Sequence, residues 1–452
     1  ARTVKSPNPA NPIEVPLVNS WWLSKKKGKE AWVRPTVQDG QVHYEVVHDS
    51  VGPADEGTIN RKGAVSVADG TPIGFDHIRS ESRAGRMGAD LIAVVAESPH
   101  GRLYISPTAE HMKAAGVSCP EGLSDAELPE QALGFRVQNY GLKRWVDLFT
   151  NRQLVAMTTL SDLVVEAREQ VLVDALISGM PEGDRLEEGG SEAHAYADAV
   201  AAYLALGVSR SADYNGALCS WNISRDTLAH VFTRQAIPMV WDYVEANPFS
   251  SSSGNFLGQI EWVVKVLDHV TSNGDGVVRQ IGALEHRYSG LVISTDPPYY
   301  DNIGYSDLSD YFYVWLRRCL QDIHPGVVGT MLTPKADELV ANPYRHDGKD
   351  GAKQFFIDGF NSVFHRIRRG VTTDAPMTVY YAYKQQDAET DGASSTGWHT
   401  LLDGLIKAGW EITATWPVRS ERAGRVRDIG SNALASSIVL ACRPRPVDAD
   451  SI

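Results

Sequence analysis

The chain has 452 residues, of which 43% are hydrophobic and 22% charged, a composition typical of a globular protein with a large core. Its formal net charge of −13 excludes a uniformly basic nucleic-acid-binding protein, although a locally basic groove remains compatible with it. No apolar run reaches the roughly 20 residues of a membrane span, and no secretory signal opens the chain. We therefore expect a cytoplasmic protein of two or three domains with no membrane partner.

The cysteines are few and widely spaced. Cys119, Cys219, Cys319 and Cys442 lie a hundred or more residues apart, and no C-x2-C pair exists. This spacing argues against a zinc site or a disulfide framework and fits a reducing compartment. The chain begins at Ala1 without a methionine, which indicates a processed start or a fragment of a longer protein.

Residues 1–120 are predicted to be a β-rich region with basic loops. Three strand-like runs within residues 13–48 are separated by a lysine-rich turn and by Asp39-Gly40, a hairpin signal. The turn lysines, which lie close to tryptophans in the sequence, are Lys25, Lys26 and Lys27. Phosphate contact and a solvated turn explain these lysines equally well.

A second basic segment follows in a stretch, residues 49–90, that shows little periodicity. Its glycine-flanked arginines are Arg79, Arg83 and Arg86. Such a segment could follow a DNA backbone, where neutralised phosphates release counterions. It could equally be a loop held by salt bridges to an acidic surface.

Residues 121–272 are predicted to be a helical insert or scaffold. A long helical pattern starts at the cap residue Thr150, and a glycine- and glutamate-rich run at 179–190 separates it from an alanine-rich helix. A third helical pattern covers residues 255–270. Apolar residues recur at helical spacing throughout, so core packing is the expected role of this region.

Residues 273–452 alternate between strand and helix patterns. Strands are expected at 277–281, 291–295, 377–384, 411–418 and 436–442, and helices at 306–320, 352–370 and 396–410. The link between the last two strands is basic and should lie at the rim of the sheet, where it is placed to contact DNA. Its arginines are Arg419, Arg422, Arg425 and Arg427.

The stretch from Leu291 to Tyr300 reads LVISTDPPYY and organises this region. Four apolar or β-branched residues predict a central strand that is buried on both faces of a parallel sheet. The two prolines then end that strand, because neither can donate a hydrogen bond to a neighbour. Asp296 is therefore expected at the carboxyl end of the strand, where ligands bind in open α/β sheets.

This arrangement suits methyl transfer to an exocyclic amino group. Asp296 and the carbonyl beside Pro297 could both accept hydrogen bonds from the NH2 of adenine or cytosine, while Pro298 stiffens the turn. Tyr299 could stack on the base. Stacking contributes roughly 1–3 kcal/mol per base, which is comparable with the few kcal/mol needed to pull a base out of a duplex.

The same residues carry a resemblance to a known family. Asp-Pro-Pro-Tyr after an apolar strand resembles the catalytic motif of amino-group DNA methyltransferases that use S-adenosylmethionine. The longer run DPPYYDNIGYSDLSDYFYVWLRR, with others such as LTPKADELVANPYRH, resembles the adenine-specific DNA methylases that carry the DUF1156 domain, some of which are linked to anti-phage defence.

The resemblance implies a fold, an activity and a site. The fold is α/β, with residues 273–452 as the C-terminal half of a Rossmann-like methyltransferase sheet. The activity is transfer of a methyl group to N6 of adenine in duplex DNA, in defence or restriction-modification. The catalytic residues are Asp296, Pro297, Pro298 and Tyr299, with Tyr300 and Asn302 lining the substrate pocket.

One expected element of such an enzyme is missing from the sequence. No convincing strand with a glycine-rich turn and a helix is present for the cofactor, and Ala283 stands where relatives often place an acid. The chain is then part of a longer protein, one half of a split enzyme completed by a partner, or a chain that has lost catalysis. The intact motif favours the first two.

Two other function classes stay open. The chain could be a non-catalytic DNA-binding or assembly subunit of a defence complex. A less favoured function is methyl transfer to an amino group of RNA or to a protein amide. Methyltransferases that act on protein glutamine usually begin the motif with Asn, so Asp296 argues against the protein amide.

Overall fold

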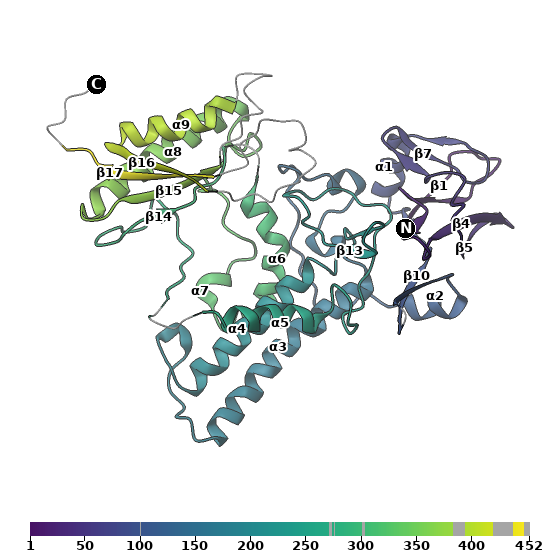
Figure 1. Ribbon diagram of the computed structural model, residues 1–452, viewed down its shortest axis with the longest axis horizontal. Helices are drawn as coiled ribbons and strands as arrows, with labels where there is room; N and C mark the ends of the chain where they lie inside the picture. The colour runs from purple at the N-terminus through teal and green to yellow at the C-terminus, as the bar shows by residue number, and fades with distance from the viewer. Residues whose placement is uncertain are drawn as a thin grey trace. The chain divides into compact units, whose positions relative to one another are not determined.

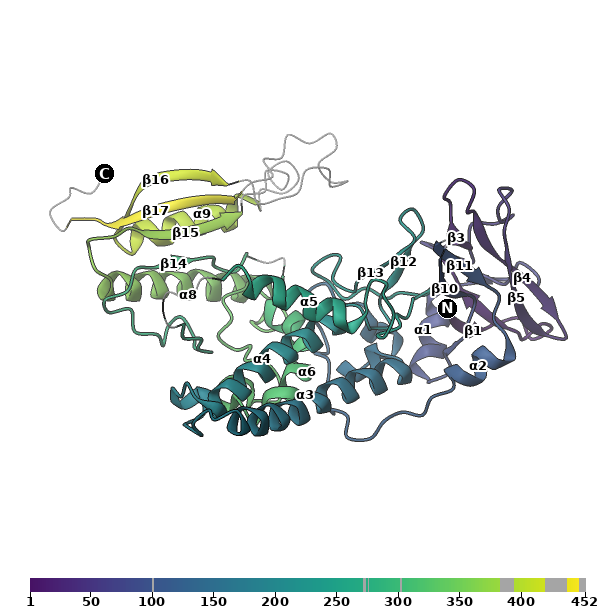
Figure 2. The ribbon, with the colours of Figure 1, turned by 60° about the horizontal axis from the view of Figure 1, so that its bottom comes forward.

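The computed structural model describes residues 1–99, 101–270, 274, 276–300, 303–382, 394–418 and 437–446 (Figures 1 and 2). The protein is mixed α/β, and its strands form several small sheets. It divides into two compact units. Unit 1 comprises Ala1–Glu130, Gly134–Val277 and Leu308–Thr333, and unit 2 comprises Gln131–Leu133, Val278–Asp307 and Pro334–Ile452. The division into regions 1–120, 121–272 and 273–452 stays a prediction.

Unit 1 begins with short antiparallel strands. They are β1 (Arg2–Lys5), β2 (Glu14–Leu17), β3 (Trp22–Ser24), β4 (Ala31–Gln38), β5 (Gln41–Val47), β6 (Ile59–Asn60), β7 (Gly63–Val65), β8 (Pro72–Ile73), β9 (Gly88–Ala89), β10 (Val94–Ser98) and β11 (Gly101–Ile105). The predicted meander is confirmed in part. β3, β4 and β5 form it, whereas β2, from the first predicted run, pairs with β1 in another sheet. Asp39 and Gly40 join β4 to β5 with φ values of 50° and 74°, and two positive φ values are the geometry of a tight hairpin turn.

Helices make up most of the rest of unit 1. They are α1 (Phe75–Arg83), α2 (Ala109–Ala115), η1 (Val137–Tyr140), η2 (Trp145–Leu148), α3 (Asn151–Ile177), η3 (Leu186–Glu188), α4 (Ala193–Ala212), α5 (Phe256–Leu267) and α7 (Pro325–Val328), with a hairpin of β12 (Ser220–Asn222) and β13 (Thr227–Ala229). The predicted cap of α3 is confirmed, because the Thr150 hydroxyl accepts a hydrogen bond from the Gln153 backbone. Helix α1 was not predicted from its sequence. It buries only Ile78 and Ser82, so tertiary packing rather than a strong apolar pattern stabilises it.

Unit 2 is built on a four-stranded sheet. Its strands are β14 (Ser294–Thr295), β15 (Met377–Ala382), β16 (Trp410–Val418) and β17 (Ser437–Pro444), in the order β14-β15-β17-β16. β14 is parallel to β15, and β17 is antiparallel to both of its neighbours. Its other elements are α6 (Tyr305–Leu320), which continues into unit 1, α8 (Gly348–Gly370) and α9 (Ser394–Lys407).

Helices α8 and α9 pack against each other and against the sheet (Figure 1). The contact is a continuous apolar core to which each element contributes large side chains. These are Phe356, Phe360 and Phe364 of α8, Leu401 and Leu405 of α9, and Met377, Val379, Tyr381 and Leu440 of the sheet. The predicted order of helix, strand, helix and closing antiparallel pair after residue 300 is therefore confirmed.

Two strand predictions in this unit are wrong. Residues 277–281 form no strand, and the strand expected over 291–295 is only Ser294–Thr295. Among the described residues β14 pairs only with β15, so it is an edge strand and not a central one. Leu291 is 41% exposed and Val292 is 70% exposed, because no neighbouring strand continues the sheet on that side in the described part of the chain. The expectation of a strand buried on both faces is corrected accordingly.

A buried ion cluster ties the helices of unit 1 together. Asp198 of α4 is fully buried, and both of its oxygens are paired, with Arg168 Nε of α3 and with Arg185 Nε, each at 2.6 Å. Burial of the Asp198 carboxyl opposes its ionisation, but hydrogen bonds from Arg185 and Arg168 lower its pKa overall. The cluster therefore contains an ionised acid, whose stabilising effect is present at neutral pH and is lost as the pH falls through this lowered pKa.

Replacing Asp198 by Asn should lower the free energy of unfolding by about 3–5 kcal/mol, because Arg168 and Arg185 both lose the buried carboxylate that pairs with them. Urea denaturation followed by circular dichroism would measure it. Asp174→Asn is the matched control, since Asp174 lies on the exposed face of α3 and accepts one hydrogen bond from Gln170. Its effect should stay within about 0.5 kcal/mol. Equal effects of the two substitutions would contradict a structural role for the cluster.

Candidate active site

The carboxyl ends of β14 and β15 define the candidate site in unit 2. Parallel strands end at the same edge of a sheet, and the register pairs Thr295 with Val379. Asp296 therefore follows β14 at the edge where Tyr381 lies near the end of β15. Pro297 and Pro298 come next and cannot extend the pairing. The sheet thus brings an acid, a stiff turn and an aromatic side chain to one edge.

Asp296 is exposed to solvent, yet the protein around it changes its acidity. Partial desolvation raises the pKa of the Asp296 carboxyl above its ordinary value. The negative charge of Asp296 also acts on Tyr305, at the start of α6. Burial, together with neighbouring Tyr299 and Asp296, raises the pKa of Tyr305 to about 12. Asp296 is thus an accessible carboxylate beside a phenol that stays protonated at neutral pH.

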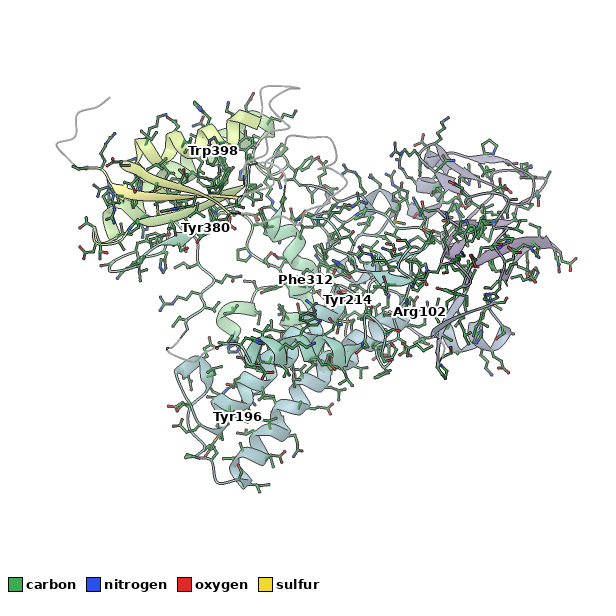
Figure 3. All side chains as sticks on the ribbon, viewed as in Figure 1. Arg102, Tyr196, Tyr214, Phe312, Tyr380 and Trp398 are labelled. Atoms are coloured by element: carbon green, nitrogen blue, oxygen red, sulfur yellow. The ribbon has the colours of Figure 1, made fainter. Side chains whose placement is uncertain are left out.

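Aromatic rings surround the turn. The Tyr299 ring meets the Tyr381 ring edge to face, with centroids 5.7 Å apart at 89°, and lies 6.5 Å from the Tyr305 ring. Tyr381 in turn lies 5.8 Å from Trp398 of α9, which is labelled in Figure 3. Tyr299 is therefore half-buried within a cluster of Tyr299, Tyr305, Tyr381 and Trp398, and its orientation is determined by packing.

Tyr300 packs into the core of unit 2. Its ring lies edge to face on Phe356 at 5.0 Å, and its carbonyl accepts a hydrogen bond of 2.6 Å from the backbone of Ala341. Gly397 also approaches closely, since a Cβ at that position would lie 3.0 Å from Tyr300 Cβ. Tyr300 therefore anchors the turn to the core. The other expected pocket residue, Asn302, lies outside the described residues.

An ion-pair network that sequence reasoning missed supports the turn. Arg345 pairs with Asp307 at 2.6 Å and with Glu338 at 2.8 Å, while Glu338 accepts hydrogen bonds from the backbone and hydroxyl of Ser306. Burial raises the pKa of Asp307, which is 1% exposed, and the Arg345 guanidinium opposes that rise. The network holds the first turn of α6, and with it Tyr305, against residues 335–345. Its members lie in DPPYYDNIGYSDLSDYFYVWLRR and LTPKADELVANPYRH, two of the sequence runs that carry the resemblance. Their place in those runs was the signal in the sequence that could have identified them.

The lysines predicted to contact DNA lie in unit 1, whereas Asp296 lies in unit 2. Lys25 is exposed, with its Nζ 5.2 Å from the centre of the Trp22 ring. Lys26 pairs with Asp226 at 2.9 Å, and Lys27 is exposed. One of the three lysines thus already has an acidic partner.

The three arginines of the second basic segment have partners within the chain. Arg79 pairs with Asp76 at 3.1 Å, Arg86 donates two hydrogen bonds to Glu81 at 2.8 and 2.7 Å, and Arg83 donates to the carbonyl of Asn139 at 3.0 Å. These contacts favour the salt-bridge interpretation of the segment. The four arginines of the basic link, Arg419, Arg422, Arg425 and Arg427, lie outside the described residues.

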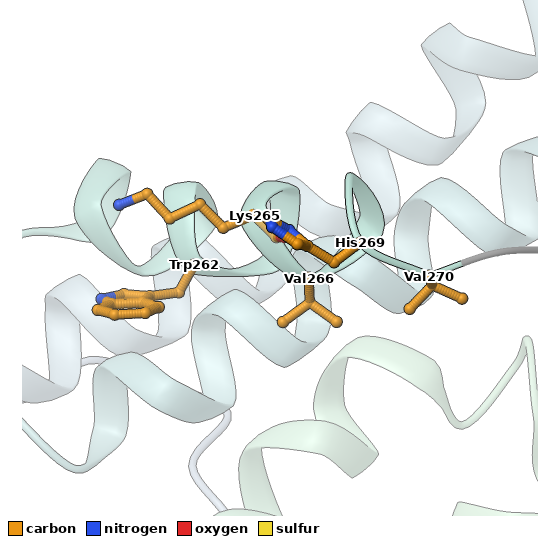
Figure 4. A pocket seen from close by; sticks show the side chains of 5 residues that line it. All are labelled: Trp262, Lys265, Val266, His269 and Val270. Carbon is orange, nitrogen blue, oxygen red and sulfur yellow. The ribbon is translucent and has the colours of Figure 1, made fainter.

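A separate apolar hollow of about 450 Å³ lies on α5 and the turn that follows it (Figure 4). Trp262, Val266 and Val270 supply its apolar lining, and all three are more than half exposed. Two cations flank the indole ring, with Lys265 Nζ at 4.8 Å and the Arg210 guanidinium at 5.6 Å from the centroid. Lys265 and His269 complete the lining, and no carboxylate belongs to it.

The described residues do not fit a complete cofactor site. A cofactor loop needs a strand of a parallel sheet, a glycine-rich turn and a helix. The nearest local match is β8, Gly74 and α1, but β8 is two residues long and pairs antiparallel with β7. S-adenosylmethionine therefore has no built cradle among these residues.

Comparisons with known proteins add no assignment. No protein-family model, no curated protein and no solved structure matches this chain.

A double-mutant cycle on Asp307 and Arg345 tests the network. Each of Asp307→Asn and Arg345→Met should destabilise unit 2, and the double variant should lose less than their sum, with a coupling of about 0.5–3 kcal/mol. Chemical denaturation would give these values. The exposed pair Lys407–Asp403 on α9 is the matched control, with an expected coupling of about 0.3–0.5 kcal/mol. Strict additivity at Asp307 and Arg345 would show that the pair does not stabilise the turn.

Proposed function

We propose that this chain is the amino-group-binding part of an S-adenosylmethionine-dependent DNA methyltransferase of the DUF1156-containing adenine methylase type. The observation that carries the proposal is the position of Asp296. An accessible carboxylate follows a strand that is parallel to its neighbour, and a packed aromatic cluster adjoins it. The favoured target is N6 of adenine in duplex DNA, within defence or restriction-modification.

The chemistry needs a better nucleophile than a free amino group. The nitrogen lone pair of adenine is delocalised into the ring. Asp296 accepts one hydrogen of the NH2 group, and the carbonyl beside Pro297 accepts the other, so the nitrogen becomes more tetrahedral. Pro298 keeps these acceptors at a fixed separation, and Tyr299 stacks on the extruded base. S-adenosylmethionine, when bound to the complete enzyme, supplies the methyl group.

The sheet supports the finer fold that this proposal requires. β14, β15 and β16 run in one direction and β17 runs against them, which agrees with the closing antiparallel pair of a methyltransferase half-sheet. We propose that the cofactor-binding half is supplied by another segment or by a partner chain. The exposed edge of β14, with Leu291 and Val292 beside it, is a suitable place for that half to continue the sheet.

A second candidate function rests on the same exposed edge. Among the described residues one edge of β14 has no partner strand, and such an edge with apolar neighbours also suits a non-catalytic assembly subunit, which would bind DNA or a partner without transferring methyl groups. Purifying the chain from its native host would separate the candidates. An associated chain that binds S-adenosylmethionine supports the enzyme, and an assembly that binds no cofactor supports the structural subunit.

Methyl transfer to duplex DNA by the assembled native complex tests the main proposal. With radiolabelled S-adenosylmethionine, Asp296→Ala should lower transfer by about 100-fold or more, because one of two acceptors of the amino group is lost. Tyr299→Phe keeps the ring and should stay near wild type, while Tyr299→Ala should lose roughly 1–3 kcal/mol of stacking. Asp358→Ala, at an exposed acid of α8, is the control. Full transfer by Asp296→Ala would refute the assignment.

The raised pKa of Asp296 predicts a pH dependence. The carboxylate is the form that accepts hydrogen bonds, so kcat/KM should fall with decreasing pH through the raised pKa. The midpoint of that acid limb should lie above about 3.9, the ordinary value for Asp. Steady-state rates across pH, with circular dichroism to exclude unfolding, would locate it. A limb at or below the ordinary value would show that Asp296 is not the titrating group.

A further inference from the structure

A polar cavity of about 690 Å³ lies in unit 2 between the end of α8 and the loop at residues 284–289. Helix α8 contributes Ser362, His365, Arg366 and Arg369, and the loop contributes His286 and Arg287. This loop precedes β14, whereas Asp296 follows it. The cavity is therefore at the opposite end of that strand from the candidate active site.

The helical wall of the cavity follows from the sequence of α8. Residues 362, 365, 366 and 369 are spaced by three or four positions, so their side chains share one face of the helix. Phe364 and Ile367 lie on another face and are buried in the core. The core thus fixes the rotation of α8 and presents the polar face to solvent.

The second wall is held to the first by specific contacts. Arg366 donates hydrogen bonds to the carbonyls of His286 at 2.9 Å and of Glu285 at 3.2 Å. Gly370 packs on the loop so closely that an added Cβ would lie 3.0 Å from Tyr288 Cβ. The Tyr288 hydroxyl donates to the carbonyl of Ala283 at 2.8 Å. The cavity is therefore built before any ligand arrives.

The charge of the lining has a single sign. Three arginines and two histidines line the cavity and no carboxylate does, in a protein whose net charge is −13. Arg287 and Arg369 are exposed, and within the described residues neither forms an ion pair. Clustered guanidinium groups repel one another, and an anion that accepts several hydrogen bonds relieves the repulsion.

We propose that this cavity binds a phosphate group. Guanidinium groups match phosphate oxygens with paired hydrogen bonds, and the Ser362 hydroxyl and the two imidazoles add further donors. The phosphate belongs either to a small phosphate ester or to a nucleic-acid backbone that passes the end of α8. The inference does not rest on methyl transfer, because the cavity and Asp296 lie at opposite ends of β14.

Isothermal titration calorimetry of the full chain with inorganic phosphate tests the site. Chloride at matched ionic strength is the control for general screening. Arg287→Gln combined with Arg369→Gln should weaken phosphate binding by about tenfold or more, because two charge-assisted hydrogen bonds are lost. Lys349→Gln with Lys353→Gln removes the same charge from two exposed positions in the first half of α8 and should leave binding unchanged. Absence of phosphate binding, or equal losses in both double variants, would overturn the proposal.

Binding of a fluorescent DNA duplex identifies the source of the phosphate. If the backbone occupies the cavity, phosphate competes with duplex, and the arginine double variant lowers the salt dependence of duplex binding by about two counterions. If a small phosphate ester occupies it, phosphate binds with no effect on duplex binding. Both results retain the phosphate site and differ only in its ligand. Methyl transfer can fail or succeed in either case.

Discussion

The parallel pairing of β14 with β15 is the constraint on which the candidate site depends. Two residue pairs, Ser294 with Thr378 and Thr295 with Val379, set the register. Through that register, Asp296 and the two prolines emerge at the same edge as Tyr381. A slip of one residue would turn every side chain of β14 to the other face, because the side-chain period of a strand is two. The geometry of the turn therefore derives from a very short pairing.

So short a strand needs support from its surroundings. Tyr300 anchors the turn to Phe356 of α8, and Arg345 holds the start of α6 through Asp307 and Glu338. The Tyr300 contact and the Arg345 ion pairs fix the chain just after Asp296, and neither of them uses the Asp296 carboxyl as a partner. A site that leaves its acid accessible while its neighbours are fixed is preorganised for a ligand.

Helix α8 links several properties of unit 2. One face carries the phenylalanines that pack on the sheet, and another carries the cations of the polar cavity. The cations lie toward the helix end, where the carbonyl dipoles favour positive charge, so these arginines are compatible with the helix itself. The sequence of α8 thus satisfies core packing, helix electrostatics and a basic surface together.

The sequence by itself determined the elements with strong local signals. Thr150 marked the start of α3, Asp39-Gly40 marked a hairpin, and the helical and strand patterns after residue 300 were found in the correct order. It also singled out Asp296, because two prolines after an apolar run define a strand end without any tertiary information. Capping, turn chemistry and periodicity are local, so a single sequence reveals them.

The tertiary structure alone decided which residues become neighbours. It made β14 an edge strand, turned Tyr300 toward the core, and placed Tyr381 and Trp398 beside Tyr299. It also joined Arg83 to the carbonyl of Asn139 and brought His286 and Arg287 to the arginines of α8. The physical reason is that burial and charge pairing depend on residues far apart in the chain, and local patterns do not encode those distances.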